Sequence, residues 1–169
     1  MKELLNKVTE GQNLTREEAA KAMDMMLEGT ASPVLVSAFL TALRMKGETV
    51  DEIVGCTEMM KSKGGSVKLD TDEYIDFVGT GGNSFNISTT SMFVCAAAGV
   101  TVAKHGNRAA SSKSGASDLL EALGANIMLE PKQVEQCINE TGMGFMNAMK
   151  FHKAMKNVGP IRKEIGIRT

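Results

Sequence analysis

Apolar residues recur every three or four positions through residues 1–68, which predicts amphipathic helices. The stretches Thr15–Glu18 and Thr49–Glu52 have the spacing of a capping box, in which two residues three apart satisfy each other's backbone amides. Ser32-Pro33 combines a helix N-cap with proline at the first helical position. Four successive helices with short links predict a small helical bundle.

From residue 69 to residue 169 short apolar runs alternate with helical stretches, which is typical of βα units around a parallel sheet. The predicted fold class is therefore α plus α/β: a helical bundle, then the first βα units of a mostly parallel sheet that is incomplete in this chain. The apolar runs are Ile75–Val78, Val100–Ala103, Ile127–Leu129 and Gly144–Met146, and the helical stretches are Thr89–Ala98, Ser117–Leu123, Pro131–Glu140 and about Lys153 to Ile165.

The first candidate site follows the run Ile75–Val78, where residues 79–90 read GTGGNSFNISTT. Glycines let backbone N–H groups approach an anion, and a helix start adds unpaired amides with a partial positive charge. Ser88, Thr89 and Thr90 add hydroxyls that can bind phosphate oxygens or a metal ion between phosphates. The glycine spacing is neither that of a P-loop nor that of a Rossmann fingerprint. The pattern favours a phosphate site, and the structural alternative is a tight turn with an ordinary N-cap.

The second candidate site follows the run Val100–Ala103. Between Lys104 and Ser117 the chain carries two lysines, an arginine and a histidine, with no acidic residue before Asp118. Open α/β sheets place ligands beyond the carboxyl ends of their strands, so two such loops converge on one crevice. Together they predict a ligand with two separated phosphate groups, a phosphorylated sugar or a nucleotide. A solvated polar loop is the alternative.

Composition narrows the function classes. Nineteen Lys plus Arg against twenty Asp plus Glu, with 4% aromatic residues, argue against a nucleic-acid partner. The three cysteines form no CxxC pair, which favours a reducing compartment over a zinc site or a disulfide framework. No apolar run approaches the roughly 20 residues that span a bilayer, and the charged start does not resemble a signal peptide. The sequence predicts a cytoplasmic protein that does not enter a membrane.

The segments GTGGNSFNIST and KHGNRAASSKSGASDLLEALG closely resemble the anthranilate phosphoribosyltransferase family, and the similarity covers essentially all 169 residues. The resemblance implies transfer of the phosphoribosyl group from phosphoribosyl pyrophosphate to anthranilate, giving phosphoribosylanthranilate and pyrophosphate in tryptophan biosynthesis, with Mg²⁺ as the cofactor. It also implies a homodimer formed through a helical domain, residues 1–68, with residues 69–169 forming the first part of a phosphoribosyl-binding domain.

The resemblance assigns site residues but no covalent catalyst. Ser88 matches the family's magnesium ligand. Gly79, Asn107 and Arg162 match anthranilate contacts, and a planar guanidinium suits a carboxylate. The residues implied for phosphoribosyl pyrophosphate are Gly82, Asn83, Ser84, Asn86, Ile87, Ser88 and Thr89 from the first loop, and Lys104, His105, Gly106, Asn107, Arg108, Ala109, Ala110, Ser111, Ser112 and Ala116 from the second.

Three departures from the family pattern bear on activity. The first loop runs from Gly82 directly into Asn83, so it is shorter and lacks the family's aspartate. Ala116 stands where the family often has serine. The Asp-Glu pair that holds Mg²⁺ in the family lies beyond the position of Thr169. We therefore expect this chain, as the N-terminal half of such an enzyme, to show little or no turnover alone. The alternatives are an enzyme like pyrimidine nucleoside phosphorylase and a non-catalytic, half-length binding or dimerisation module.

Overall fold

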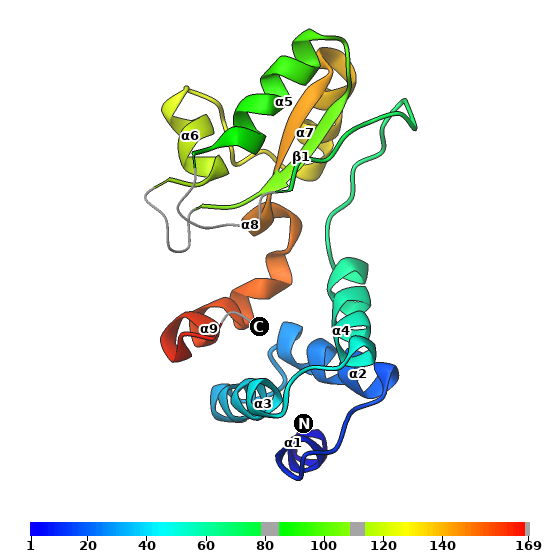
Figure 1. The fold of residues 1–169 in the computed structure, drawn as a ribbon, viewed down its shortest axis with the longest axis vertical. Helices are drawn as coiled ribbons and strands as arrows, with labels where there is room; N and C mark the ends of the chain where they lie inside the picture. Colours follow the sequence, from blue (N-terminus) through cyan, green and yellow to red (C-terminus); the bar gives the residue numbers. More distant parts are fainter. Residues whose placement is uncertain (79–84, 109–113, 168–169) are drawn as a thin grey trace. The chain divides into compact units, whose positions relative to one another are not determined.

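The computed structural model describes residues 1–78, 85–108 and 114–167, which form two compact units (Figure 1). The first unit combines Met1–Gly64 with His152–Thr169, and the second is Gly65–Phe151. The helical part followed by an α/β part confirms the predicted fold class.

Helices make up the first unit. Both predicted capping boxes form: Thr15 Oγ1 accepts a hydrogen bond from Glu18 N at 3.2 Å, and Glu18 Oε2 accepts one from Thr15 N at 3.0 Å. Ser32 caps the next helix through Leu35 N at 3.4 Å. The helices are α1 (Lys2–Thr9), α2 (Arg16–Leu27), α3 (Pro33–Lys46), α4 (Val50–Ser62), the 3₁₀ helix η1 (Lys153–Asn157) and α9 (Gly159–Ile165).

The core of this unit includes the chain's last segment. Val158 is 2% exposed and belongs to the same apolar cluster as Val36 and Phe39. Asn157 Nδ2 donates to the carbonyl of Leu27 at 2.7 Å, at the end of α2. These contacts group residues 152–167 with the helices, whereas the sequence pattern grouped them with the α/β part. The predicted boundary at residue 68 stays a prediction.

A buried carboxylate ties the helical unit together. Glu52, which is 1% exposed, accepts hydrogen bonds from Leu14 N at 2.8 Å, Thr49 N at 2.7 Å and Lys46 Nζ at 2.9 Å. Lys46 Nζ also donates to Asn13 Oδ1 and to a carbonyl. Burial by itself raises the pKa of Glu52. The three hydrogen bonds and the positive charge of Lys46 together lower this pKa by more, so it lies below the ordinary value. The Glu52 carboxylate, which helps to cap α4, thereby connects the start of α4 with Leu14 and with Lys46 at the end of α3.

The second unit is built on a parallel pair of strands. β1 (Val102–Gly106) and β2 (Met143–Asn147) run parallel with Val102 opposite Met143. Ile75 pairs with the other edge of β1: Ile75 N donates to Thr101 O at 2.9 Å and Ala103 N donates to Ile75 O at 3.0 Å. The helices are α5 (Ile87–Ala97), α6 (Ala116–Ala122), α7 (Pro131–Thr141) and α8 (Ala148–Phe151).

Helices cover both faces of these strands (Figure 1). Val102 is buried in a cluster with residues of α5 and α6, and Ala103 is buried in a cluster with residues of α7 and α8. Successive side chains of a strand point to opposite faces, which explains this division. The prediction of βα units around a parallel sheet is confirmed.

Three of the predicted elements differ in the structure. In the run Ile75–Val78 only Ile75 pairs with β1, through an isolated bridge, so this run is not a full strand. Ile127–Leu129 is not a strand: Ile127 lies in a turn and is buried beside Met92, so the apolar run fills the core without pairing. The predicted last helix is divided into η1 and α9. Pro160 has no amide hydrogen and its ring would clash with a preceding helical carbonyl, so a new helix begins at Gly159-Pro160.

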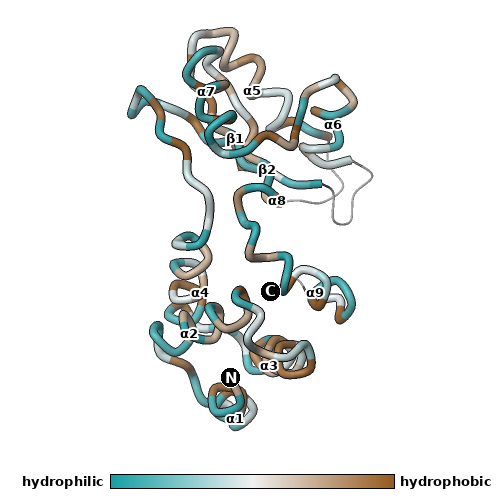
Figure 2. The backbone as a smooth tube through the Cα atoms, turned by 180° about the vertical axis from the view of Figure 1, so that it is seen from behind, coloured by the Kyte–Doolittle hydropathy of each residue, from teal (hydrophilic) through white to brown (hydrophobic). Residues whose placement is uncertain are grey.

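None of the described helices is both long and apolar enough to span a membrane. Figure 2 shows hydrophobic positions on α3. Two of its large apolar side chains, Val34 and Met45, are exposed.

We expect Glu52→Gln to lower the free energy of unfolding by about 3 kcal/mol, because it leaves the buried Lys46 ammonium without its anion and turns an amide NH₂ toward at least one donor, such as Leu14 N. Chemical denaturation followed by circular dichroism measures this. The control is Glu58→Gln, which removes an exposed ion pair to Arg16 and should cost less than about 1 kcal/mol.

Comparison of the wild type with Glu52→Gln also tests how stability depends on pH. Folding lowers the pKa of Glu52 below its ordinary 4.5, so its stabilisation is fully present above that value and is lost as the pH falls through the folded-state pKa. The difference between wild type and Glu52→Gln should therefore shrink in acid. A difference that stays constant down to the folded-state pKa would contradict the assignment.

Candidate functional site

The two predicted loops leave from neighbouring positions of the second unit. Asp76 and Phe77 lie beside β1, and the second loop begins where β1 ends at Gly106. A hydrogen bond from Asn86 Nδ2 to Ser114 Oγ at 3.0 Å joins the described parts of the two loops. Parallel pairing therefore places the described ends of both loops at the carboxyl end of β1.

A buried ammonium lies between Phe77 and the first turn of α5. Lys104 is 2% exposed, and its Nζ donates to the carbonyl of Phe77 at 2.6 Å and lies 3.5 Å from Ser88 Oγ. Within the described ranges no carboxylate lies within ion-pair distance of it. Burial lowers the pKa of Lys104, and the negative charge of Asp76 partly opposes this. Among the described residues its hydrogen-bond partners are neutral oxygens, and an anion beside it would offset its desolvation.

The start of α5 adds a second attraction for anions. Asn86 occupies the N-cap position, but its side chain does not cap the helix because it is bonded to Ser114. No described side chain caps the amides of this first turn. Ser88, in that turn, has its hydroxyl within reach of Lys104. An uncapped helix start beside a buried cation is a suitable place for a phosphate group.

Asp76 aligns the neighbouring residue of β1. Its Oδ1 accepts a hydrogen bond from the backbone N–H of His105 at 3.3 Å. Neither this contact nor the role of the Phe77 carbonyl was predicted from the sequence. Their position one strand away from Lys104 could be inferred only once the pairing of Ile75 with β1 was known.

Glycine is required at the end of β1. A Cβ on Gly106 would lie 2.8 Å from a ring carbon of Phe145 and 3.2 Å from the Cβ of Ala116. The close approach of β2 and α6 explains this residue as packing. It also sets where the second loop begins.

The second loop is closed at its base. Asn107 O accepts a hydrogen bond from Ser117 N at 3.3 Å, and Gly115 N donates to Asp118 Oδ2 at 2.8 Å. Arg108 turns toward α6, where its guanidinium pairs with Asp118 at 3.0 Å and with Glu121 at 2.8 and 3.0 Å. Hydrogen bonds to Glu121 and Asp118 raise the pKa of Arg108, and Arg108 in turn lowers the pKa of Glu121.

The described residues do not fit a magnesium ion on their own. Ser88 Oγ, the predicted ligand, has the Lys104 ammonium 3.5 Å away, and a cation repels a cation. No group of three or more His, Cys, Asp or Glu that could hold a metal occurs in the described part of the chain. Magnesium needs oxygen ligands and keeps several waters or phosphate oxygens, which a single hydroxyl does not provide.

The other predicted site residues fall into three groups. Ile87 is 64% exposed and Thr89 is 1% exposed on the first turn of α5. Arg162 lies on α9 in the first unit. Eight predicted residues lie outside the described residues: Gly79, Gly82, Asn83, Ser84, Ala109, Ala110, Ser111 and Ser112.

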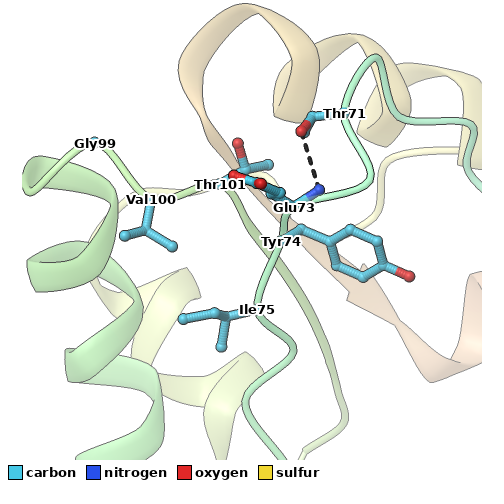
Figure 3. Close-up of a pocket in the computed structure, with 7 residues that line it drawn as sticks. All are labelled: Thr71, Glu73, Tyr74, Ile75, Gly99, Val100 and Thr101. Atoms are coloured by element: carbon cyan, nitrogen blue, oxygen red, sulfur yellow. Dashed lines mark hydrogen bonds between the residues drawn. The ribbon is translucent and has the colours of Figure 1, made fainter.

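The opposite end of β1 carries a depression of about 420 Å³ (Figure 3). Thr71 Oγ1 accepts a hydrogen bond from Glu73 N there at 3.0 Å. None of the predicted site residues lines it. Its lining residues are Thr71, Glu73, Tyr74, Ile75, Gly99, Val100 and Thr101.

Comparison with known proteins agrees with this architecture. Residues 71–169 match the α/β domain of a glycosyl transferase family, and residues 2–64 match the helical bundle domain of that family. The chain belongs to this glycosyl transferase family.

Individual relatives narrow the class. The anthranilate phosphoribosyltransferase of Acetivibrio thermocellus is 52% identical over 172 residues, covering 100% of this chain and 50% of the relative. That of Nitrobacter hamburgensis is 54% identical, covering 100% of this chain and 51% of the relative. The resemblance seen in the two loops is thereby confirmed. The chain spans about half the length of the curated relatives it matches.

Solved structures agree. The anthranilate phosphoribosyltransferase of Thermus thermophilus superposes with a TM-score of 0.87 at 40% identity, covering 98% of this chain and 51% of that one. The Saccharomyces cerevisiae enzyme, solved in complex with PRPP and Mg, gives a TM-score of 0.79 at 30% identity, covering 91% and 47%.

Ser117, at the base of the second loop, allows a test of how its buried hydroxyl affects the free energy of unfolding. It is fully buried, and its hydroxyl has no hydrogen-bond partner within the described ranges. We expect Ser117→Ala to raise the free energy of unfolding by about 1 kcal/mol, because it removes an unsatisfied buried polar group. Chemical denaturation measures it, with the exposed Ser66→Ala as the control. A loss of stability in Ser117→Ala beyond that control would show that the hydroxyl has a partner.

Proposed function

We propose that this chain binds phosphoribosyl pyrophosphate at the carboxyl end of β1 and serves the transfer of its phosphoribosyl group to anthranilate. The products are phosphoribosylanthranilate and pyrophosphate, a step of tryptophan biosynthesis. The observation that carries the proposal is the buried Lys104 ammonium beside the uncapped start of α5. The names of the relatives support the choice of substrates.

Charge supports the first substrate. In the described residues Lys104 Nζ has a carbonyl and a hydroxyl for neighbours, and the charge of Asp76, which lies beyond ion-pair distance, offsets its desolvation only in part. Phosphoribosyl pyrophosphate carries phosphate oxygens at both ends, which meet the cation and the helix amides. A group that binds the leaving pyrophosphate also stabilises the negative charge that develops on it during transfer.

The acceptor side rests on fewer described residues. Asn107 stands at the end of β1, where its side chain accepts a hydrogen bond from Arg108 N at 2.8 Å. Gly79 and Arg162 are assigned to anthranilate by resemblance, and that assignment is part of the proposal. A second substrate held against the first contributes to rate mainly through proximity.

Magnesium enters the proposal only as a companion of phosphoribosyl pyrophosphate, as in the yeast complex. Because the described residues do not form a metal site, no step is assigned to the ion. Ser88 as a ligand stays a prediction.

The helical unit supports a homodimer. Val34 and Met45 lie eleven residues apart on α3, on the same helical face, and they are 78% and 83% exposed. Val50 and Ile53 on α4 are 76% and 54% exposed. Apolar side chains gathered on a helix face are typical of an interface. We place the protein in the cytoplasm because its three cysteines, Cys56, Cys95 and Cys137, are free thiols.

Light scattering after gel filtration tests the dimer. We expect a mass of about twice 18.0 kDa for the wild type and a shift toward one chain for Met45→Glu, because a charge is costly to bury in an apolar interface. Met149→Glu, at an exposed methionine of the second unit, is the matched control. A wild-type mass of one chain would contradict the dimer.

Titration calorimetry tests the substrate site. We expect phosphoribosyl pyrophosphate to bind the wild type, and Lys104→Met to weaken binding at least about tenfold, the equivalent of one charge-assisted contact. The unfolding free energy of Lys104→Met should stay equal or rise, because a desolvated charge is removed. Lys132→Met, on the exposed side of α7, should bind as the wild type does.

Two results would contradict the proposal: no binding of phosphoribosyl pyrophosphate by the wild type, or equal binding by Lys104→Met. Titration of inorganic phosphate with a pyrimidine nucleoside tests the phosphorylase alternative. Binding without turnover is expected for this chain alone, and it also fits a half-length binding module. Adding anthranilate to the complex separates these two functions, since only a transferase half should bind it.

A further inference from the structure

Arg108 is the most basic group of the second loop, yet it turns to α6. Its guanidinium makes a two-pronged pair with Glu121, Nη1 to Oε2 at 2.8 Å and Nη2 to Oε1 at 3.0 Å. Nη1 also donates to Asp118 Oδ1 at 3.0 Å. Asp118 and Glu121 lie three residues apart, so they present both carboxylates on one face of α6.

Backbone contacts reinforce this pairing. Ser117 N donates to Asn107 O at 3.3 Å, and Gly115 N donates to the same Asp118 carboxylate at 2.8 Å. The residues that enter the second loop are therefore tied to those that leave it. We call this set of contacts among Asn107, Arg108, Ser117, Asp118 and Glu121 the clasp.

Charge argues against a phosphate role for the Arg108 side chain. One guanidinium faces two carboxylates, so its positive charge is already offset by residues of α6. A phosphate contact would also require Arg108 to give up three hydrogen bonds to carboxylates.

We infer that Arg108 is a positioning residue, which holds the base of the second loop through the clasp and does not itself contact the substrate phosphates. The inference rests on the proposed function for what the loop binds. Lys104, at the start of the same segment, faces the first loop instead of α6. The two cations therefore have different roles: Lys104 supplies charge to the site, and Arg108 sets the geometry of the chain around it.

The clasp is tested first without any ligand. Hydrogen exchange followed by NMR should show that the Gly115 and Ser117 amides exchange at least about threefold faster in Arg108→Gln and in Glu121→Gln than in the wild type, because both changes open the base of the loop. Arg108→Lys should behave like Arg108→Gln, since an ammonium cannot make the two-pronged pair. The control is Glu130→Gln, which removes the ion pair to Lys150 in the same unit.

The effect of Glu121→Gln on the binding of phosphoribosyl pyrophosphate then decides the role of Arg108. If Arg108 positions the loop, Glu121→Gln and Arg108→Gln each weaken the binding of phosphoribosyl pyrophosphate by about fivefold, and the double variant is no weaker than either, as expected for two partners of one interaction. If Arg108 bound phosphate directly, Glu121→Gln would free it, and binding would tighten or stay unchanged while Arg108→Gln weakened it. That pattern would overturn the inference.

Unchanged amide exchange in both variants would also overturn it. A wild type that binds no phosphoribosyl pyrophosphate contradicts the proposed function instead, and in that case the exchange rates still decide whether the clasp exists.

Discussion

A positive charge held away from water by neutral oxygens is the constraint around which the second unit is arranged. Lys104 lies on β1, and the chain on either side of it is fixed by parallel pairing. That pairing brings the carbonyl of Phe77 to the ammonium and the first turn of α5 close to it. Because burial of a charge without an ion-pair partner is costly, the packing around Lys104 must offset that cost.

The helical unit handles a buried charge in the opposite way. Glu52 accepts hydrogen bonds from two amides and from an ammonium, and Lys46 has further oxygens to bind. The opposite charges of Glu52 and Lys46 are paired and hydrogen-bonded within the chain, so this ion pair stabilises the fold. Lys104 lacks such a partner among the described residues, which is the physical difference between a structural charge and one that is ready for a ligand.

Local rules predicted much of this structure. The capping residues at Thr15, Ser32 and Thr49 set helix starts through contacts within four residues, and such contacts can be found in the sequence. The strand Ile127–Leu129 was wrongly predicted, because three apolar residues can be buried in a turn as well as in a strand. The hydrogen bond from Leu14 to Glu52 spans 38 positions, and no local pattern indicates it.

The candidate site shows the same limit of prediction from sequence. The basic and glycine-rich loops could be located from composition and strand order, but the direction in which each cation points could not. The Arg108 side chain is directed by contacts with α6, and the Lys104 side chain by the carbonyl of Phe77, in the segment that pairs with β1. One signal was available for Arg108: Asp118 and Glu121 have helical spacing directly after a basic loop, a pattern that favours an ion pair.

The hydrogen bond between Asn86 and Ser114 has a consequence for how this protein can evolve. Asparagine is a good helix cap, but here its side chain is hydrogen-bonded to Ser114 of the other loop, so it does not cap the amides of α5. A residue at this position that capped its own helix would strengthen the start of α5 but would give up the hydrogen bond to Ser114. A gain in local helix stability at residue 86 would therefore be offset by the loss of a contact between the described ends of the two loops.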